Sequence, residues 1–257
     1  MKSIVRFLSI AVIATVAFSA CNKDNTKYNG QEDPAKSNIG YLALGGMEAS
    51  VLEDTENVNT ETRADGVDIN MFDVTITNTS DEVVKSFKYG ARPTDAIELE
   101  AGVYTIAMSS TAMAGAEWET PVYGAEREVI ITRKQTTEVK DIVCKLRNIK
   151  VSVAYSADIK AQLDPEYTTM TVALADSSLE YAFEEERAGY FAPVAEENTL
   201  QLTFKCRYVD GDKDIIMTNE ITGVKAAQWR KINVVVQHAA DGSANIGIVC
   251  DTWTYDE

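Results

Sequence analysis

Apolar and polar residues alternate with a period of two along most of the chain. The alternation is clear in segments 72–76, 97–100, 104–108, 149–155, 200–208 and 232–236. Successive side chains of a strand point to opposite faces of its sheet, so this period is typical of antiparallel strands with one buried face. Turn residues separate the segments, for example Asp210, Gly211 and Asp212. The pattern predicts an all-β chain.

Helical periodicity is almost absent from the sequence. Only the residues after Ser156 suggest a helix, and it must be short because Pro165 follows. The number and spacing of the strands are typical of β-sandwiches. We therefore expect two antiparallel sandwiches in tandem, which meet near Arg147 and Asn148.

The N-terminus has the features of an export signal. Lys2 and Arg6 precede an apolar run at 7–18, which is too short to span a bilayer comfortably. The run ends in Ser19 and Ala20, directly before Cys21. This arrangement resembles a bacterial lipobox, in which the cysteine is acylated and becomes the first mature residue. The alternative is an ordinary signal peptide in which Cys21 has no special role.

Residues 22–38 are polar and contain almost nothing apolar, as is typical of a flexible tether. The predicted organisation is thus a signal peptide at 1–20, a tether at 21–38, and β-sandwiches at 39–147 and 148–257. Acyl chains on Cys21 would anchor the protein to a membrane, since each buried methylene contributes about 0.8 kcal/mol.

The chain is strongly acidic, with 40 acidic and 24 basic residues and a formal net charge of −16. Removal of the signal peptide takes away two further positive charges. Such a surface repels nucleic acid, so we expect no nucleic-acid partner.

Three cysteines follow Cys21, namely Cys144, Cys206 and Cys250, and their spacing matches no zinc or redox motif. Each falls on the apolar side of a predicted strand, which favours buried thiols. A disulfide between two of them is also compatible with export and stays open here.

The sequence offers little for catalysis or metal binding. His238 is the only histidine, so catalysis through a histidine base would have to use it, and no nucleophile motif is present. The acidic runs at 184–186 and 196–197 are typical of solvated loops rather than of a catalytic carboxylate pair. We expect no enzyme activity, no cofactor and no metal.

Two tryptophans near strand ends, Trp118 and Trp229, are candidates for stacking on sugar rings. Aromatic residues of sandwiches more often serve packing. This leaves a surface module that binds glycans or host ligands as the alternative function.

Segments 72–77, 97–106, 118–124 and 139–153 resemble fimbrillin-like lipoproteins of Gram-negative anaerobes, the superfamily behind type V pili. The resemblance includes a branch described only as a domain of unknown function. It implies two transthyretin-like sandwiches, export as a lipoprotein, and a surface-exposed position on the outer membrane. It also implies a structural or adhesive role as pilus subunit, anchor or accessory protein.

In pilus subunits of this superfamily, an Arg-specific protease cuts after an arginine that follows the first strand. The matching position here is Arg63, followed by Ala64, in a polar stretch at 53–68. The strand that would be released contains Tyr41, Leu42, Ala43 and Leu44. A neighbouring subunit's strand would then fill the groove and build a polymer. The alternative is an uncut loop that keeps the first strand.

N-terminal sequencing and lipid analysis of the membrane-extracted protein test the predicted anchor. We expect Cys21 to be the first residue and to carry acyl chains. A mature chain that starts at Asn22, or one without lipid, would contradict the assignment.

Overall fold

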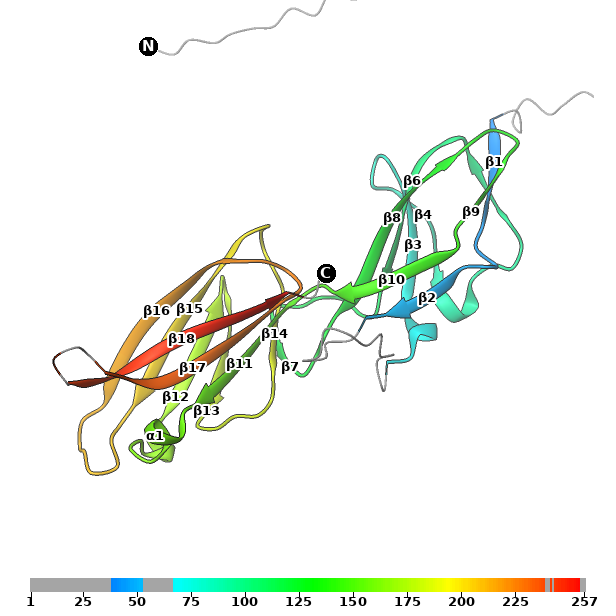
Figure 1. Ribbon diagram of the computed structural model, residues 1–257. Coiled ribbons are helices and arrows are strands. Elements are labelled where there is room, and N and C mark those ends of the chain that lie inside the picture. Colours follow the sequence, from blue (N-terminus) through cyan, green and yellow to red (C-terminus); the bar gives the residue numbers. More distant parts are fainter. Residues whose placement is uncertain (1–37, 53–66, 239–240, 242, 255–257) are drawn as a thin grey trace, which may run out of the picture. The chain divides into compact units, whose positions relative to one another are not determined.

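The computed structural model of the chain describes residues 38–52, 67–238, 241 and 243–254 (Figure 1). Most of these residues lie in strands, which confirms the predicted all-β sandwich class. The helical elements are single turns, α1 (Ala157–Lys160), η2 (Ile69–Met71), η3 (Tyr89–Ala91) and η4 (Pro165–Tyr167). Within the described ranges, no helix is long and apolar enough to cross a membrane.

The first half of the chain forms two sheets over one hydrophobic core. The three-stranded sheet has the order β5 (Ile97–Glu100), β1 (Ile39–Ala43), β9 (Thr136–Glu138). The six-stranded sheet has the order β2 (Glu48–Val51), β10 (Asp141–Leu146), β8 (Tyr123–Ile131), β6 (Gly102–Ser109), β3 (Asp73–Asn78), β4 (Val83–Lys88). The first core lies among their inward side chains and includes Leu42, Phe72, Ile76, Ile106 and Leu146.

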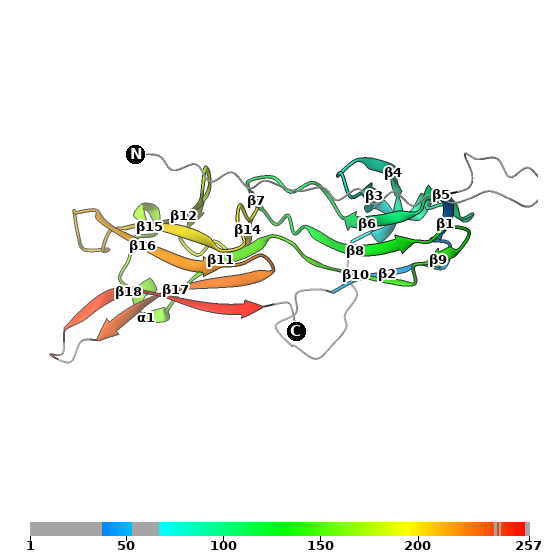
Figure 2. The same ribbon diagram turned by 90° about the horizontal axis from the view of Figure 1, so that it is seen from above.

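The second half forms two further sheets. The five-stranded sheet has the order β18 (Ala244–Thr254), β17 (Gln228–His238), β11 (Ile149–Tyr155), β14 (Gly189–Phe191), β7 (Ala116–Trp118). The four-stranded sheet has the order β13 (Ser177–Ala182), β12 (Thr169–Leu174), β15 (Asn198–Cys206), β16 (Ile215–Val224). Figure 2 shows β17 and β18 on one side of this sandwich and β12 and β15 on the other. The second core includes Ile149, Val172, Tyr181, Phe204 and Ile232.

The alternating pattern matches burial closely. Along β15, Leu200, Leu202, Phe204 and Cys206 are buried while the intervening residues are exposed. Most strand pairs are antiparallel, as predicted, but three pairs are parallel: β1 with β9, β2 with β10, and β11 with β17. Alternation identifies a strand but carries no information about the direction of its partner.

One strand of the first half belongs to a sheet of the second. β7 lies between β6 and β8 in the sequence, but it pairs with β14 of the second half. Glu117 lies opposite Tyr190 in this pair. The buried Asn148 strengthens this connection, since its side chain donates to Thr120 O at 3.0 Å and accepts from Val122 N at 3.3 Å. The division into tandem domains at residues 147 and 148 stays a prediction.

The three cysteines of the described part are free thiols. Cys144 and Cys206 are buried and Cys250 is half-buried, so no disulfide joins any two of them. Burial raises the pKa of the Cys144 and Cys206 thiols to about 11, against a smaller opposite effect of Arg147 on Cys144. Both thiols are therefore neutral at pH 7.

Replacement of Phe204 by alanine tests the second core. The ring is fully buried, and we expect Phe204→Ala to lower the free energy of unfolding by about 3–5 kcal/mol because it leaves a cavity. The measurement is denaturant unfolding followed by tryptophan fluorescence. Ile216→Ala on β16 is the control, since that side chain is 65% exposed and should change stability by no more than about 0.5 kcal/mol. Equal losses in the two variants would contradict the packing described.

Candidate functional site

The candidate site is the slot in the first half that holds residues 38–52, here called the N-terminal segment. The segment begins with β1, which lies between β5 and β9 as the middle strand of its sheet. β1 runs antiparallel to β5, with Tyr41 opposite Glu98, and parallel to β9, with Tyr41 opposite Thr136. Both long edges of β1 are therefore paired.

Main-chain hydrogen bonds hold the segment along its whole length. At its start, Lys134 N donates to Ile39 O at 2.8 Å, and Tyr41 N donates to Gln135 O at 2.9 Å. At its end, Leu52 N donates to Cys144 O at 2.9 Å. Backbone amides and carbonyls are costly to bury without a hydrogen-bond partner. The segment and the strands around it supply such partners to each other.

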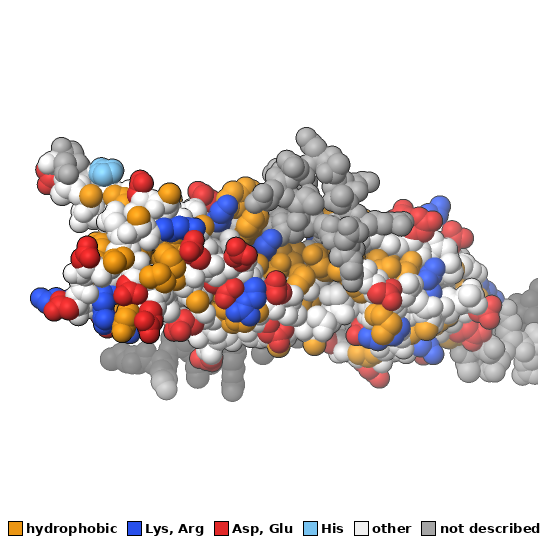
Figure 3. Space-filling view, turned by 90° about the horizontal axis from the view of Figure 1, so that it is seen from below, with side chains coloured by type: hydrophobic (Ala, Val, Ile, Leu, Met, Phe, Trp, Pro, Cys, Tyr) orange, Lys and Arg blue, Asp and Glu red, His pale blue; other side chains and the backbone are white. Residues whose placement is uncertain are grey.

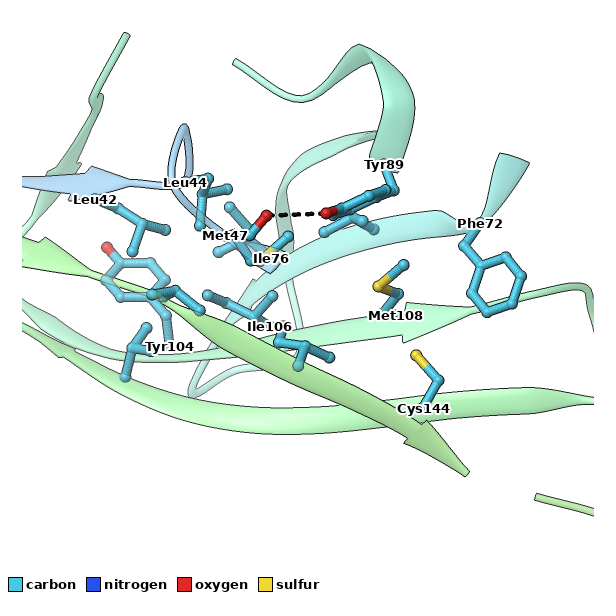
Figure 4. Packing of buried hydrophobic residues seen from close by; sticks show 14 of the residues in the cluster. Leu42, Leu44, Met47, Phe72, Ile76, Tyr89, Tyr104, Ile106, Met108 and Cys144 are labelled. Atoms are coloured by element: carbon cyan, nitrogen blue, oxygen red, sulfur yellow. Dashed lines mark hydrogen bonds between the residues drawn. The ribbon is translucent and has the colours of Figure 1, made fainter. Parts of the chain in front are cut away.

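Side chains of the segment fill the first core. Leu42, Leu44 and Met47 have no exposed surface and contact the same cluster as Ile76 and Ile106 (Figure 4). Full burial of one such side chain contributes about 1.5–3 kcal/mol. The segment therefore supplies a substantial share of this core's apolar burial.

The close fit extends to the backbone at Gly40. A Cβ atom there would collide with the Thr132 carbonyl oxygen and the Ile131 side chain. Only glycine lets β1 approach the end of β8 so closely.

Tyr89 of η3 forms two hydrogen bonds with the middle of the segment. Its hydroxyl donates to Met47 O at 2.9 Å, the dashed line in Figure 4, and accepts from Ala49 N at 3.1 Å. The side chain itself is buried. One hydroxyl thus satisfies a carbonyl between β1 and β2 and an amide within β2.

A hollow of about 520 Å³ adjoins the turn between β1 and β2. Gly45 and Gly46 line one part of it, and Glu48, Glu138, Lys140 and Asp141 line another. The part of the chain that the structure describes contains no group of three or more His, Cys, Asp or Glu placed to hold a metal ion.

Several predicted site residues lie outside the described residues. These are Cys21, Arg63 and Ala64, together with the predicted signal peptide and nearly all of the predicted tether. Their roles stay predictions. Tyr41, Leu42, Ala43 and Leu44, predicted as the released strand, lie in or directly after β1.

Trp118 and Trp229 lie on different strands of one sheet, and each ring already has neighbours. Trp118 packs edge-on against Tyr181 with ring centroids 4.6 Å apart, and the Arg187 guanidinium lies 4.6 Å from its ring. Trp229 lies between Lys150 and Trp253. Sugar stacking on either ring stays a prediction.

Three residues of the acidic runs form ion pairs with basic side chains. Glu184 pairs with Lys160, Glu185 with Arg187 at 2.7 Å, and Glu197 with Lys225 at 3.3 Å. The hydrogen bond from Arg187 lowers the pKa of Glu185 to about 2. Figure 3 shows one face on which acidic and basic side chains are interspersed, with the histidine at one end. His238 is exposed at the end of β17.

A family model described as "Domain of unknown function (DUF4493)" matches residues 38–257. The chain belongs to this family. A description of this kind agrees with the expectation, and the relation to fimbrillin-like lipoproteins stays a prediction. The match begins at the N-terminal segment, so the segment is part of the family's domain. No curated protein matches the chain.

Three solved structures of bacterial proteins are similar to the chain at low sequence identity. A proposed polysaccharide-binding protein from Bacteroides thetaiotaomicron has 8% identity and a TM-score of 0.45, covering 85% of this chain and 99% of its own. A proposed adhesin from Bacteroides ovatus has 12% identity and a TM-score of 0.42, and the match covers 85% of this chain and 96% of the adhesin. A fimbrial assembly protein from Parabacteroides distasonis has 9% identity and a TM-score of 0.41, and the match covers 78% of this chain and 98% of that protein. All three TM-scores lie below 0.5 and add nothing to the fold or the function.

The sequence pattern missed two parts of the site. β2 was not predicted, although Met47, Ala49 and Val51 alternate with Glu48 and Ser50 and could have indicated it. The role of Tyr89 has no local signal, because its two partners lie 42 and 40 residues away in the chain.

Removal of the Tyr89 hydroxyl tests how the segment is held. We expect Tyr89→Phe to destabilise the protein by about 1–3 kcal/mol, because it leaves Met47 O and Ala49 N without this partner. Hydrogen exchange should be faster at the amides of Tyr41 and Ala49. The matched control is Tyr41→Phe on the same segment, where we expect little change. Unaltered exchange in Tyr89→Phe would contradict the role of the hydroxyl.

Proposed function

We propose that the chain is a fimbrillin-like surface lipoprotein with a structural or adhesive role, as a pilus subunit, anchor or accessory protein. Acyl chains on Cys21 hold it to the outer membrane, with the two sandwiches exposed at the cell surface. The N-terminal segment is then a removable strand, and the bond after Arg63 decides whether it stays.

The observation that carries this proposal is the middle position of β1. The segment is continuous in sequence, and Arg63 lies between its last residue, Leu52, and η2, which begins at Ile69. A cut after Arg63 would separate β1 and β2 from everything that follows, together with Cys21. One bond therefore divides the chain into a lipid-bearing strand pair and the remainder of the domain.

Loss of the segment would leave an acceptor for another strand. β5 and β9 would each lose their pairing to β1, and the apolar surface now covered by Leu42, Leu44 and Met47 would face solvent. An unpaired edge beside apolar pockets favours the addition of a strand from another chain. A second copy of the protein, or a related subunit, is the partner that we propose.

Without the cut, the same features describe an anchor. The segment would stay inserted, and Cys21 would tether a chain that accepts no further strand. The processing state thus separates a polymerising subunit from an anchor or accessory protein.

Treatment of the mature protein with an Arg-specific protease tests the proposal. We expect a new N-terminus at Ala64 and ladders that resist SDS, and we expect Arg63→Ala to abolish both. Arg133→Ala, at an exposed arginine after β8, should behave as the wild type. Excess synthetic peptide with the sequence of residues 38–52 should suppress the ladders by refilling the slot. A cut protein that stays monomeric without the peptide would contradict strand addition.

A further inference from the structure

The two strands of the N-terminal segment are held unequally. β1 is a middle strand and is paired along both of its edges, with β5 on one side and β9 on the other. β2 is an edge strand of the six-stranded sheet, and among the described residues β10 is its one partner strand. Release of β1 therefore breaks two ladders of main-chain hydrogen bonds, whereas release of β2 breaks one.

Side-chain burial differs in the same direction. Leu42 of β1, and Leu44 directly after this strand, have no exposed surface. Within β2, Val51 is the single buried side chain, and Glu48 and Ser50 are exposed. Each buried apolar side chain adds to the free energy that release of its strand costs. The release of β2 therefore exposes less apolar surface than the release of β1.

The backbone around β1 adds further attachments. Ile39 O and Tyr41 N both bond to the connection between β8 and β9. Gly40 lies against Thr132 with no room for a Cβ atom. η2 lies beside β2, but within the described ranges no main-chain hydrogen bond joins η2 to β2. β2 thus depends mainly on its ladder with β10.

The Tyr89 hydroxyl lies at the boundary between the two strands. It donates to Met47 O, just before β2, and accepts from Ala49 N, within β2. Release of β2 breaks the bond from Ala49 and can leave the bond to Met47 intact. The hydroxyl therefore stabilises both strands without requiring that they leave together.

A buried thiol lies on β10 beside β2. Cys144 is directly opposite Val51 of β2, and opposite residues of neighbouring strands point to the same face of the sheet. The Cys144 side chain has no exposed surface, and Figure 4 shows it near Met108 in the first core. When β2 leaves, Val51 leaves with it and β10 becomes the edge of the sheet. Cys144 then becomes accessible from that edge.

We propose that the N-terminal segment opens in two steps, in which β2 leaves β10 first and β1 leaves β5 and β9 afterwards. The first surface offered to an incoming strand is then the edge of β10 at Asp141–Cys144, before the place of β1 is vacant. The inference rests on the proposed function, because the incoming strand is the one that a second copy of the chain would supply. The order of opening itself requires neither cleavage after Arg63 nor polymerisation.

Thiol labelling of the uncut protein tests this order. Arg63→Ala keeps the chain uncut, N-ethylmaleimide is the reagent, and mass spectrometry of peptides locates the label. Cys206 is the matched thiol, since it is also free and fully buried but lies in the second core. Burial raises the pKa of both thiols to about 11. We expect Cys144 to react at least tenfold faster than Cys206, because local opening of β2 is more frequent than unfolding of a core.

Two tyrosine variants give a crossed control. Tyr89→Phe should raise the labelling rate of Cys144 about fivefold to tenfold and leave that of Cys206 unchanged, because it removes a bond that holds β2. Tyr181→Phe removes another buried hydroxyl, which donates to Val151 O at 3.2 Å in the second core. It should raise the rate at Cys206 and leave the rate at Cys144 unchanged.

Hydrogen exchange in the Arg63→Ala protein separates the two steps. Leu52 N, which donates to Cys144 O, should exchange at least tenfold faster than Tyr41 N, because β1 is still in place when β2 has opened. Equal labelling of Cys144 and Cys206, or equal exchange of Leu52 and Tyr41, would overturn the two-step order. Neither result would contradict the proposed function, which fails instead if the cut protein forms no ladders.

Discussion

The first half of the protein depends on a single constraint, the middle position of β1 in a three-stranded sheet. β5 and β9 have no pairing to each other and are joined only through β1. Backbone amides and carbonyls buried without partners are costly, so the sheet exists only while a strand occupies this position. Since the sheet also carries Leu42 into the first core, its pairing and the packing of that core are not independent.

The slot therefore restricts which strand can occupy it. A strand in the slot must alternate apolar residues with small or polar ones, in register with β5 and β9. It must have a glycine at the position of Gly40. It must also supply a main-chain carbonyl and a main-chain amide to the Tyr89 hydroxyl. The native segment meets these conditions. Any other strand in this slot would have to meet most of them.

Much of this architecture was readable from the sequence, and the limits have physical causes. Alternation predicted the long strands, such as β6 and β15, because one of their faces is buried. It missed short strands such as β7 and β14, where three residues give too little periodicity. The contact of Lys150 with Trp229 could not be predicted, because the two residues become neighbours only through the parallel pairing of β11 with β17. The role of Cys21 remains a prediction from local sequence, and that of Arg63 a prediction from the family resemblance.

The N-terminal segment packs into the first core only. None of residues 38–52 belongs to the second core, so loss of the N-terminal segment leaves the support of β11, β17 and β18 in place. A subunit cut after Arg63 would therefore keep its second core while it exposes the slot between β5 and β9.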